Sequence, residues 1–163
     1  METGAAGADG DKGWWRERGD RVLDQVDARM APEDRATFFE AAYRHVEAAG
    51  VWELFPEVIE VLEALAPRYQ LAVISNFDGR LRLILRHLAI ARFFRHLFIS
   101  SELGVDKPEP LIYRRALELS GGAAEDALPL GDEPDRDWQA AGAAGGGASR
   151  RRRPPTAARA ILR

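Results

Sequence analysis

The chain has 163 residues, of which 46% are hydrophobic and 30% charged, and its formal net charge is -3. This length and composition predict one globular domain with a sizeable core, and the acidic balance disfavours a surface that binds nucleic acid or anionic membranes throughout. The absence of cysteine excludes disulfides, thiolate metal sites and a cysteine nucleophile. No apolar run approaches the roughly 18 residues of a membrane span, so we expect a cytoplasmic protein with no membrane partner.

The N-terminal third of the chain shows only helical patterns. Residues 1–12 are rich in glycine and alanine, and we expect them to be disordered. From residue 13 to about residue 50, apolar residues recur at helical spacing in two runs. The two runs are separated before Pro32, which suits the first turn of the second helix, and Gly50 is a natural stop. This stretch therefore predicts a helical unit without strands.

Beyond residue 52, short apolar runs alternate with helical patterns. Strands are predicted at 71–75 and 96–100, with a weaker third strand at 127–131 that a proline interrupts. Helices are expected from Val58 to near Pro67, from about Leu81 to Leu88, from Glu109 to Leu119 and from Asp135 to about Ala144. This alternation predicts right-handed βαβ units and an α/β fold with a Rossmann-like parallel sheet.

Polar residues follow each predicted strand. Ser75 and Asn76 follow the first strand, Lys107 comes shortly after the second, and Asp132 and Asp137 follow the third. Because the carboxyl ends of parallel strands meet at one edge of a sheet, we expect these side chains to converge. A hydroxyl and an ammonium can hold phosphoryl oxygens, and carboxylates are ligands that Mg2+ prefers. The pattern indicates phosphoryl chemistry, with Asn76 either donating to a phosphate or holding the turn.

Three of these segments resemble motifs of the haloacid dehalogenase-like (HAD) hydrolase superfamily. Residues 73–78 are similar to its second motif, residues 100–108 to its third, and Gly131-Asp132 with Asp137 to its fourth. The resemblance covers roughly residues 52–138, about half of the chain. It implies an incomplete HAD core with a partial helical cap.

The resemblance also implies a role for each strand-end residue. Ser75 would hydrogen-bond the phosphoryl group, and Lys107 would steady the charge of nucleophile and phosphate; we take both as candidate catalytic residues. Asp132 would bind Mg2+, and Asp137 would support the metal site. Ser75, Asn76 and Lys107 would together bind the substrate, which we expect to be a small phosphorylated metabolite.

The family's first motif, Asp-x-Asp-x-Thr/Val on the first strand, has no counterpart in the expected place. That motif supplies the nucleophile and the general acid/base, and its strand lies between those represented here by 71–75 and 127–131. Asp9-Gly10-Asp11 has the spacing but no apolar strand before it, and we interpret it as coincidence. We therefore expect weak or absent catalysis, with a non-catalytic binding or regulatory protein, or a truncated gene product, as the alternatives. An incomplete sheet would also favour self-association.

The predicted organisation has four parts. Residues 1–12 form a disordered N-terminus, 13–52 a partial helical cap, 53–148 the HAD-like core and 149–163 an arginine- and proline-rich tail. The run Arg150–Arg153 could bind nucleic acid or phosphoinositides, but a solvated tail is the favoured interpretation and no nucleic-acid partner is expected.

Overall fold

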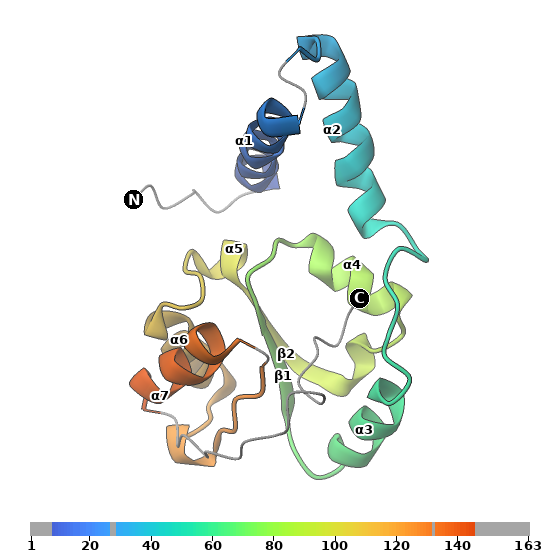
Figure 1. Cartoon of the computed structure of the whole chain (residues 1–163). Helices are drawn as coiled ribbons and strands as arrows, with labels where there is room; N and C mark the ends of the chain where they lie inside the picture. Colours follow the sequence, from blue (N-terminus) through green and yellow to red (C-terminus); the bar gives the residue numbers. More distant parts are fainter. Residues whose placement is uncertain (1–7, 27–28, 132, 146–163) are drawn as a thin grey trace.

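The computed structural model describes residues 8–26, 29–131 and 133–145, and divides them into a helical pair and an α/β core. Figure 1 shows helices α1 (Ala8–Val26) and α2 (Pro32–Glu47) standing on the core; we call this pair the cap. The predicted break ahead of Pro32 is confirmed, with the proline in the first turn of α2. Helix α1 starts before residue 13, where the helical pattern becomes readable, so Asp9 and Asp11 lie in a helix.

The core alternates helices and strands along the chain. Its elements are α3 (Val58–Leu65), β1 (Leu71–Ser75), α4 (Arg80–His87), the 3-10 helix η1 (Ala91–Phe93), β2 (Phe94–Ile99), α5 (Ser100–Leu103), α6 (Pro110–Ser120), the 3-10 helix η2 (Ala124–Asp126), the π-helical segment η3 (Pro134–Gln139) and α7 (Ala140–Ala143).

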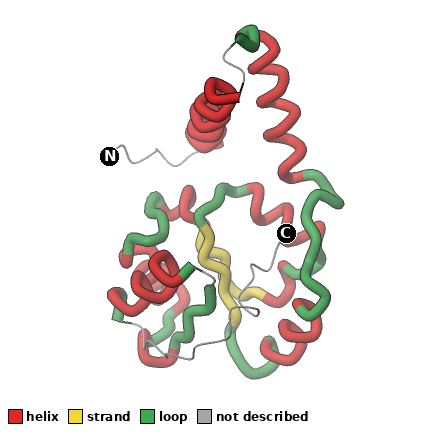
Figure 2. Tube along the Cα trace, viewed as in Figure 1, coloured by secondary structure: helices red, strands yellow, loops and turns green. Residues whose placement is uncertain are grey.

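The two strands form a parallel pair that places both of their carboxyl ends together. Ser75, the last residue of β1, lies opposite Ile99, the last residue of β2. Figure 2 shows this pair in yellow with helices and loops around it. The helix α4 and the turn η1 connect the strands, so the predicted βαβ unit is confirmed.

The predicted third strand is wrong. Residues 127–131 adopt no strand, and their two leucines, Leu128 and Leu130, are 61% and 79% exposed. A strand forms only where a neighbour accepts its main-chain hydrogen bonds, and within the described residues β1 pairs with β2 alone. Pro129 removes one further main-chain donor from the segment.

Two hydrophobic clusters lie among the core helices and strands. One joins α3, α4 and β2 through five buried residues, Leu62, Leu81, Leu85, Ile90 and Ile99. The other joins α6 and α7 through Ile112, Tyr113, Ala140 and Ala141, and Ile74 of β1 packs against it. Each fully buried Leu or Ile contributes about 1.5–3 kcal/mol relative to an exposed one. Figure 1 shows helices on either side of the strands, as expected of a Rossmann-like α/β core.

Two further sequence predictions concern a membrane span and the basic tail. Among the helices that the structure describes, none combines the length and the apolar character needed to cross a bilayer. Arg150–Arg153, together with the predicted tail 149–163, lies outside the described residues.

Candidate functional site

The side chain of Asn76 joins the two loops that follow the strands. Its Nδ2 donates to the Lys107 carbonyl at 2.8 Å, and the Lys107 backbone N–H donates to its Oδ1 at 2.7 Å. An Asn amide offers both donors and an acceptor, so it can satisfy both backbone groups of one residue. The Asn76 amide therefore positions the lysine, as in the turn-holding alternative for this residue, and its contact with substrate stays a prediction.

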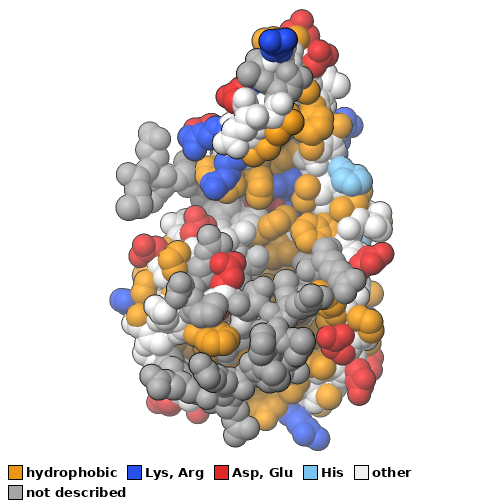
Figure 3. All heavy atoms as spheres, viewed as in Figure 1, with side chains coloured by type: hydrophobic (Ala, Val, Ile, Leu, Met, Phe, Trp, Pro, Cys, Tyr) orange, Lys and Arg blue, Asp and Glu red, His pale blue; other side chains and the backbone are white. Residues whose placement is uncertain are grey.

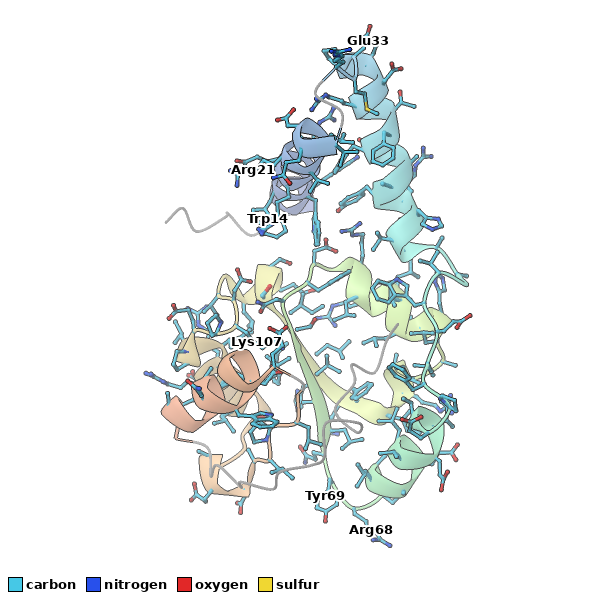
Figure 4. All side chains as sticks on the ribbon, viewed as in Figure 1. Trp14, Arg21, Glu33, Arg68, Tyr69 and Lys107 are labelled. Atoms are coloured by element: carbon cyan, nitrogen blue, oxygen red, sulfur yellow. The ribbon has the colours of Figure 1, made fainter. Side chains whose placement is uncertain are left out.

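The loop that carries Lys107 reverses at a glycine. Helix α5 ends at Leu103, and Gly104 follows it in the left-handed conformation, with φ +65° and its N–H donating to the Ser100 carbonyl at 2.8 Å. A residue with a Cβ is strained in this conformation, so glycine suits the reversal. Figure 4 shows Lys107 between α6 and the strand pair.

Lys107 and Asp137 form a largely buried ion pair, although the strand predicted ahead of Asp137 does not form. The Lys107 Nζ lies 2.8 Å from Asp137 Oδ1, and the two side chains are 19% and 7% exposed. The Glu133 N–H donates to the other carboxylate oxygen at 3.2 Å. Gly131 makes room for this carboxylate, because a Cβ on it would come within 2.6 Å of the Asp137 Cβ.

Tyr113 of α6 is the partner that the sequence analysis missed. Its hydroxyl donates to Asp137 Oδ1 at 3.4 Å. Burial, together with the charge of Asp137 and this hydrogen bond, raises the pKa of Tyr113 well above its ordinary value, so the phenol keeps its proton. The helical pattern around Tyr113 indicates only a residue of the buried face, between Ile112 and Ala116. No sequence signal distinguishes it from ordinary core.

The structure gives no site contact for two of the predicted site residues, Ser75 and Asp132. Ser75 is half-buried at the end of β1, and within the described part of the chain its hydroxyl has no hydrogen-bond partner. It directly precedes Asn76, whose side chain hydrogen-bonds the Lys107 backbone. Asp132, the predicted Mg2+ ligand, lies outside the described residues.

The described residues do not by themselves fit a magnesium ion. Among them, no three His, Asp or Glu side chains are grouped so that they could hold a metal. Both oxygens of Asp137 already accept hydrogen bonds, and its nearest charged neighbour is the Lys107 ammonium. Since Mg2+ requires oxygen ligands in octahedral array, Asp137 alone cannot provide the site.

A parallel α/β core with a helical cap and a polar site at the strand ends defines a HAD-like protein. The family model described as haloacid dehalogenase-like hydrolase matches residues 2–145, and the chain belongs to this family.

Relatives of known name include hydrolases and phosphatases. Haloacid dehalogenase-like hydrolase domain-containing protein 3 of Xenopus laevis is 32% identical over 132 residues, covering 78% of this chain and 52% of that protein. A phosphoserine phosphatase of Thermus thermophilus is 35% identical over 117 residues, covering 71% of this chain and 46% of the relative. The chain spans about half the length of the curated relatives it matches.

One similar solved structure is a predicted phosphoglycolate phosphatase from Haemophilus somnus. It shares 26% identity and a TM-score of 0.64, with 88% of this chain and 64% of that chain covered. This likeness agrees with an incomplete Rossmann-like HAD core.

Proposed function

We propose that the strand-end site binds the phosphoryl group of a small phosphorylated metabolite, in the manner of a HAD-type phosphatase. The observation that carries the proposal is the hydrogen-bonded connection from Asn76 through Lys107 to Asp137. Ser75 would donate its hydroxyl to a phosphoryl oxygen, and Lys107 would neutralise the phosphate charge. Kinship with a phosphoserine phosphatase supports this substrate class.

We further propose that these 163 residues alone turn over substrate weakly or not at all. The family resemblance assigns the nucleophile and the general acid/base to an aspartate pair after a strand, and the printed sequence has no such pair in that context. Without a nucleophile no aspartyl-phosphate forms, and without the acid/base the leaving group is not protonated. The alternative role is that of a non-catalytic protein that binds phosphorylated ligands.

Mg2+ is the cofactor that the resemblance implies. Asp132 would be its ligand and Asp137 its support, with further carboxylates needed because Asp137 is already paired with Lys107. Bound Mg2+ would neutralise phosphate charge.

The test combines hydrolysis of p-nitrophenyl phosphate in the presence of Mg2+ with binding of inorganic phosphate by calorimetry. We expect no turnover above buffer, and phosphate binding that Lys107→Met abolishes but the surface variant Arg82→Met leaves unchanged. Turnover that Asp132→Asn abolishes would overturn the proposed inactivity. Phosphate binding that is absent, or indifferent to Lys107, would overturn the proposed site.

We also propose that the chain associates with a second copy of itself. Within the described residues β1 pairs along one edge only, and an open edge strand is a template for pairing. The exposed Leu128 and Leu130 add apolar surface for such a contact. Light scattering should give a mass above the 18.1 kDa of one chain, and a monomer at all concentrations would refute the association. A cytoplasmic location stays a prediction.

A further inference from the structure

Arg80, the first residue of α4, lies where the cap meets the core. Its guanidinium carbon is 3.6 Å from the centroid of the Tyr43 ring in α2, and its Nη1 donates to the Tyr43 carbonyl at 2.8 Å. The rings of Trp15 in α1 and Phe77 in the core lie at 5.5 and 5.7 Å. A single cation thus contacts both cap helices and the loop that follows β1.

Asp78 neutralises this cation inside the junction. Nε of Arg80 donates to Oδ1 at 2.9 Å and Nη2 donates to Oδ2 at 2.7 Å, while the Arg80 backbone N–H also donates to Oδ1. The side chains of Arg80 and Asp78 are 8% and 3% exposed. The N-cap of α4 is Gly79, and the Asp78 carboxylate accepts the backbone N–H of Arg80 in the first turn.

The charge state of the pair is fixed by these contacts. Burial would raise the pKa of Asp78, but the hydrogen bonds and the charge of Arg80 outweigh burial and lower it. The carboxylate is therefore ionised at neutral pH, and the two planar groups face each other with two parallel hydrogen bonds. Such a pair holds the guanidinium in one orientation, with its face against Tyr43.

The junction is continuous with the strand-end loop. Phe77, two residues after Ser75, lies 6.1 Å from Trp15 and 6.4 Å from Trp52, measured between ring centroids. Its carbonyl accepts hydrogen bonds from the Ser100 hydroxyl and the Ser101 N–H, both at 3.3 Å. On the face in Figure 3, hydrophobic side chains continue from the cap helices to this junction.

We propose that Arg80 is the positioning residue that docks the cap onto the core. Asp78 neutralises the Arg80 guanidinium and fixes its orientation. Tyr43 of α2 then packs its ring against the guanidinium and accepts a hydrogen bond from it through its backbone carbonyl. Desolvated contacts of this kind are stronger than exposed ones. Weakening them releases α1 and α2 while the core stays folded. The proposal concerns the docking of the cap and does not depend on hydrolytic activity.

Hydrogen exchange of the intact chain, followed by mass spectrometry, tests this docking. Arg80→Lys keeps a charge but cannot reproduce the two-pronged pairing or the flat face against Tyr43. We expect amides of α2 to exchange at least about tenfold faster than in the unmodified protein, with β1 and β2 unchanged. Arg82→Lys on the same helix, where the partner Glu102 is half-exposed, is the matched control and should leave both regions unchanged.

A second variant leaves the buried ion pair in place. Tyr43→Leu removes the ring beneath the guanidinium, and Phe38→Leu, at an exposed aromatic of the same helix, is its control. Faster exchange confined to α1 and α2 in Arg80→Lys and Tyr43→Leu, but not in the controls, supports the docking role. Unchanged exchange of α2, or equal loss of protection in the cap and in β1 and β2, would overturn it.

Discussion

Two buried ion pairs, Asp78–Arg80 and Lys107–Asp137, are built in opposite ways. Arg80 binds a carboxylate two residues away with several hydrogen bonds and gives another donor to a backbone carbonyl. Lys107 reaches a carboxylate 30 residues away, and among the described residues its ammonium has that one hydrogen-bond partner. Since an ammonium has three donors, Lys107 keeps capacity for a ligand, whereas Arg80 is committed to its neighbours. We call the Asp78–Arg80 pair saturated, because its donors are used within the protein, and the Lys107–Asp137 pair unsaturated, because the ammonium keeps donors for a ligand. A saturated pair suits a structural junction, and an unsaturated pair suits a binding site.

The largest effect is expected on breaking the saturated pair. Asp78→Asn keeps the volume of the side chain but leaves the Arg80 charge buried without a counter-ion. We expect the free energy of unfolding to fall by about 3–5 kcal/mol, measured by urea denaturation followed by circular dichroism. The control is Glu102→Gln at the half-exposed Arg82 pair, which should cost about 1 kcal/mol or less. Equal losses of unfolding free energy in the two variants would show that the buried Asp78–Arg80 pair stabilises the protein no more than the half-exposed Arg82–Glu102 pair.

A smaller effect is expected at the unsaturated pair. Lys107→Met leaves the Asp137 carboxylate with the Tyr113 hydroxyl and the Glu133 N–H, so the loss of stability should be about 2 kcal/mol. Asp137→Asn completes a double-mutant cycle, measured in urea like the first variant. Because the two groups are in contact, their losses should not add, and strictly additive losses would show that the ion pair contributes no coupling.

Some parts of the fold and of the site could be predicted from the sequence and others could not. Helices and the first two strands follow from local hydrophobic spacing. Lys107 meets Asp137 as expected, although only Lys107 follows a strand of the observed pair. The segment 127–131 has strand-like residues yet no strand, because pairing depends on a neighbour that local spacing does not reveal.

The contact between Arg80 and the cap could not be predicted from the sequence, for a different reason. A short Asp-x-Arg spacing before a helix indicates only a helix start, and the partner ring lies 37 residues away in α2. Long-range packing of this kind has no period in the sequence. The same holds for Tyr113. In the sequence it is one more residue of the buried face of α6, and only the three-dimensional position of Asp137 shows that its hydroxyl has a partner.

The stability that the Asp78–Arg80 pair contributes should depend on pH. The pKa of Asp78 is lowered in the folded protein below its ordinary value of 3.8. Its contribution to stability is therefore fully present above pH 3.8 and is lost as the pH falls through the folded-state pKa. We expect the difference in unfolding free energy between the unmodified protein and Asp78→Asn to stay constant from neutrality down to about pH 4 and to narrow as the pH falls further to about pH 3. A difference that stays constant over this range would mean that the charge of Asp78 is not what stabilises the junction.

The smallest effect should come from the neutral side-chain donor at the Lys107–Asp137 pair, the Tyr113 hydroxyl. Tyr113→Phe removes a 3.4 Å hydrogen bond to Asp137 Oδ1 without changing the ring that packs in the core. We expect a loss of about 0.5–1.5 kcal/mol in unfolding free energy, because one weak partner of a buried carboxylate is lost while Lys107 remains.

Tyr69→Phe, at a tyrosine that is 63% exposed, provides the matched control and should leave stability unchanged. If Tyr113→Phe behaves like this control, the hydroxyl contributes nothing to stability, and Lys107 and the Glu133 N–H hold the carboxylate without it. If instead the Tyr113→Phe loss grows in the Lys107→Met background, the phenol is a reserve donor. It would then keep Asp137 satisfied whenever the lysine turns toward a ligand, which is the property that distinguishes this pair from the committed Asp78–Arg80 junction.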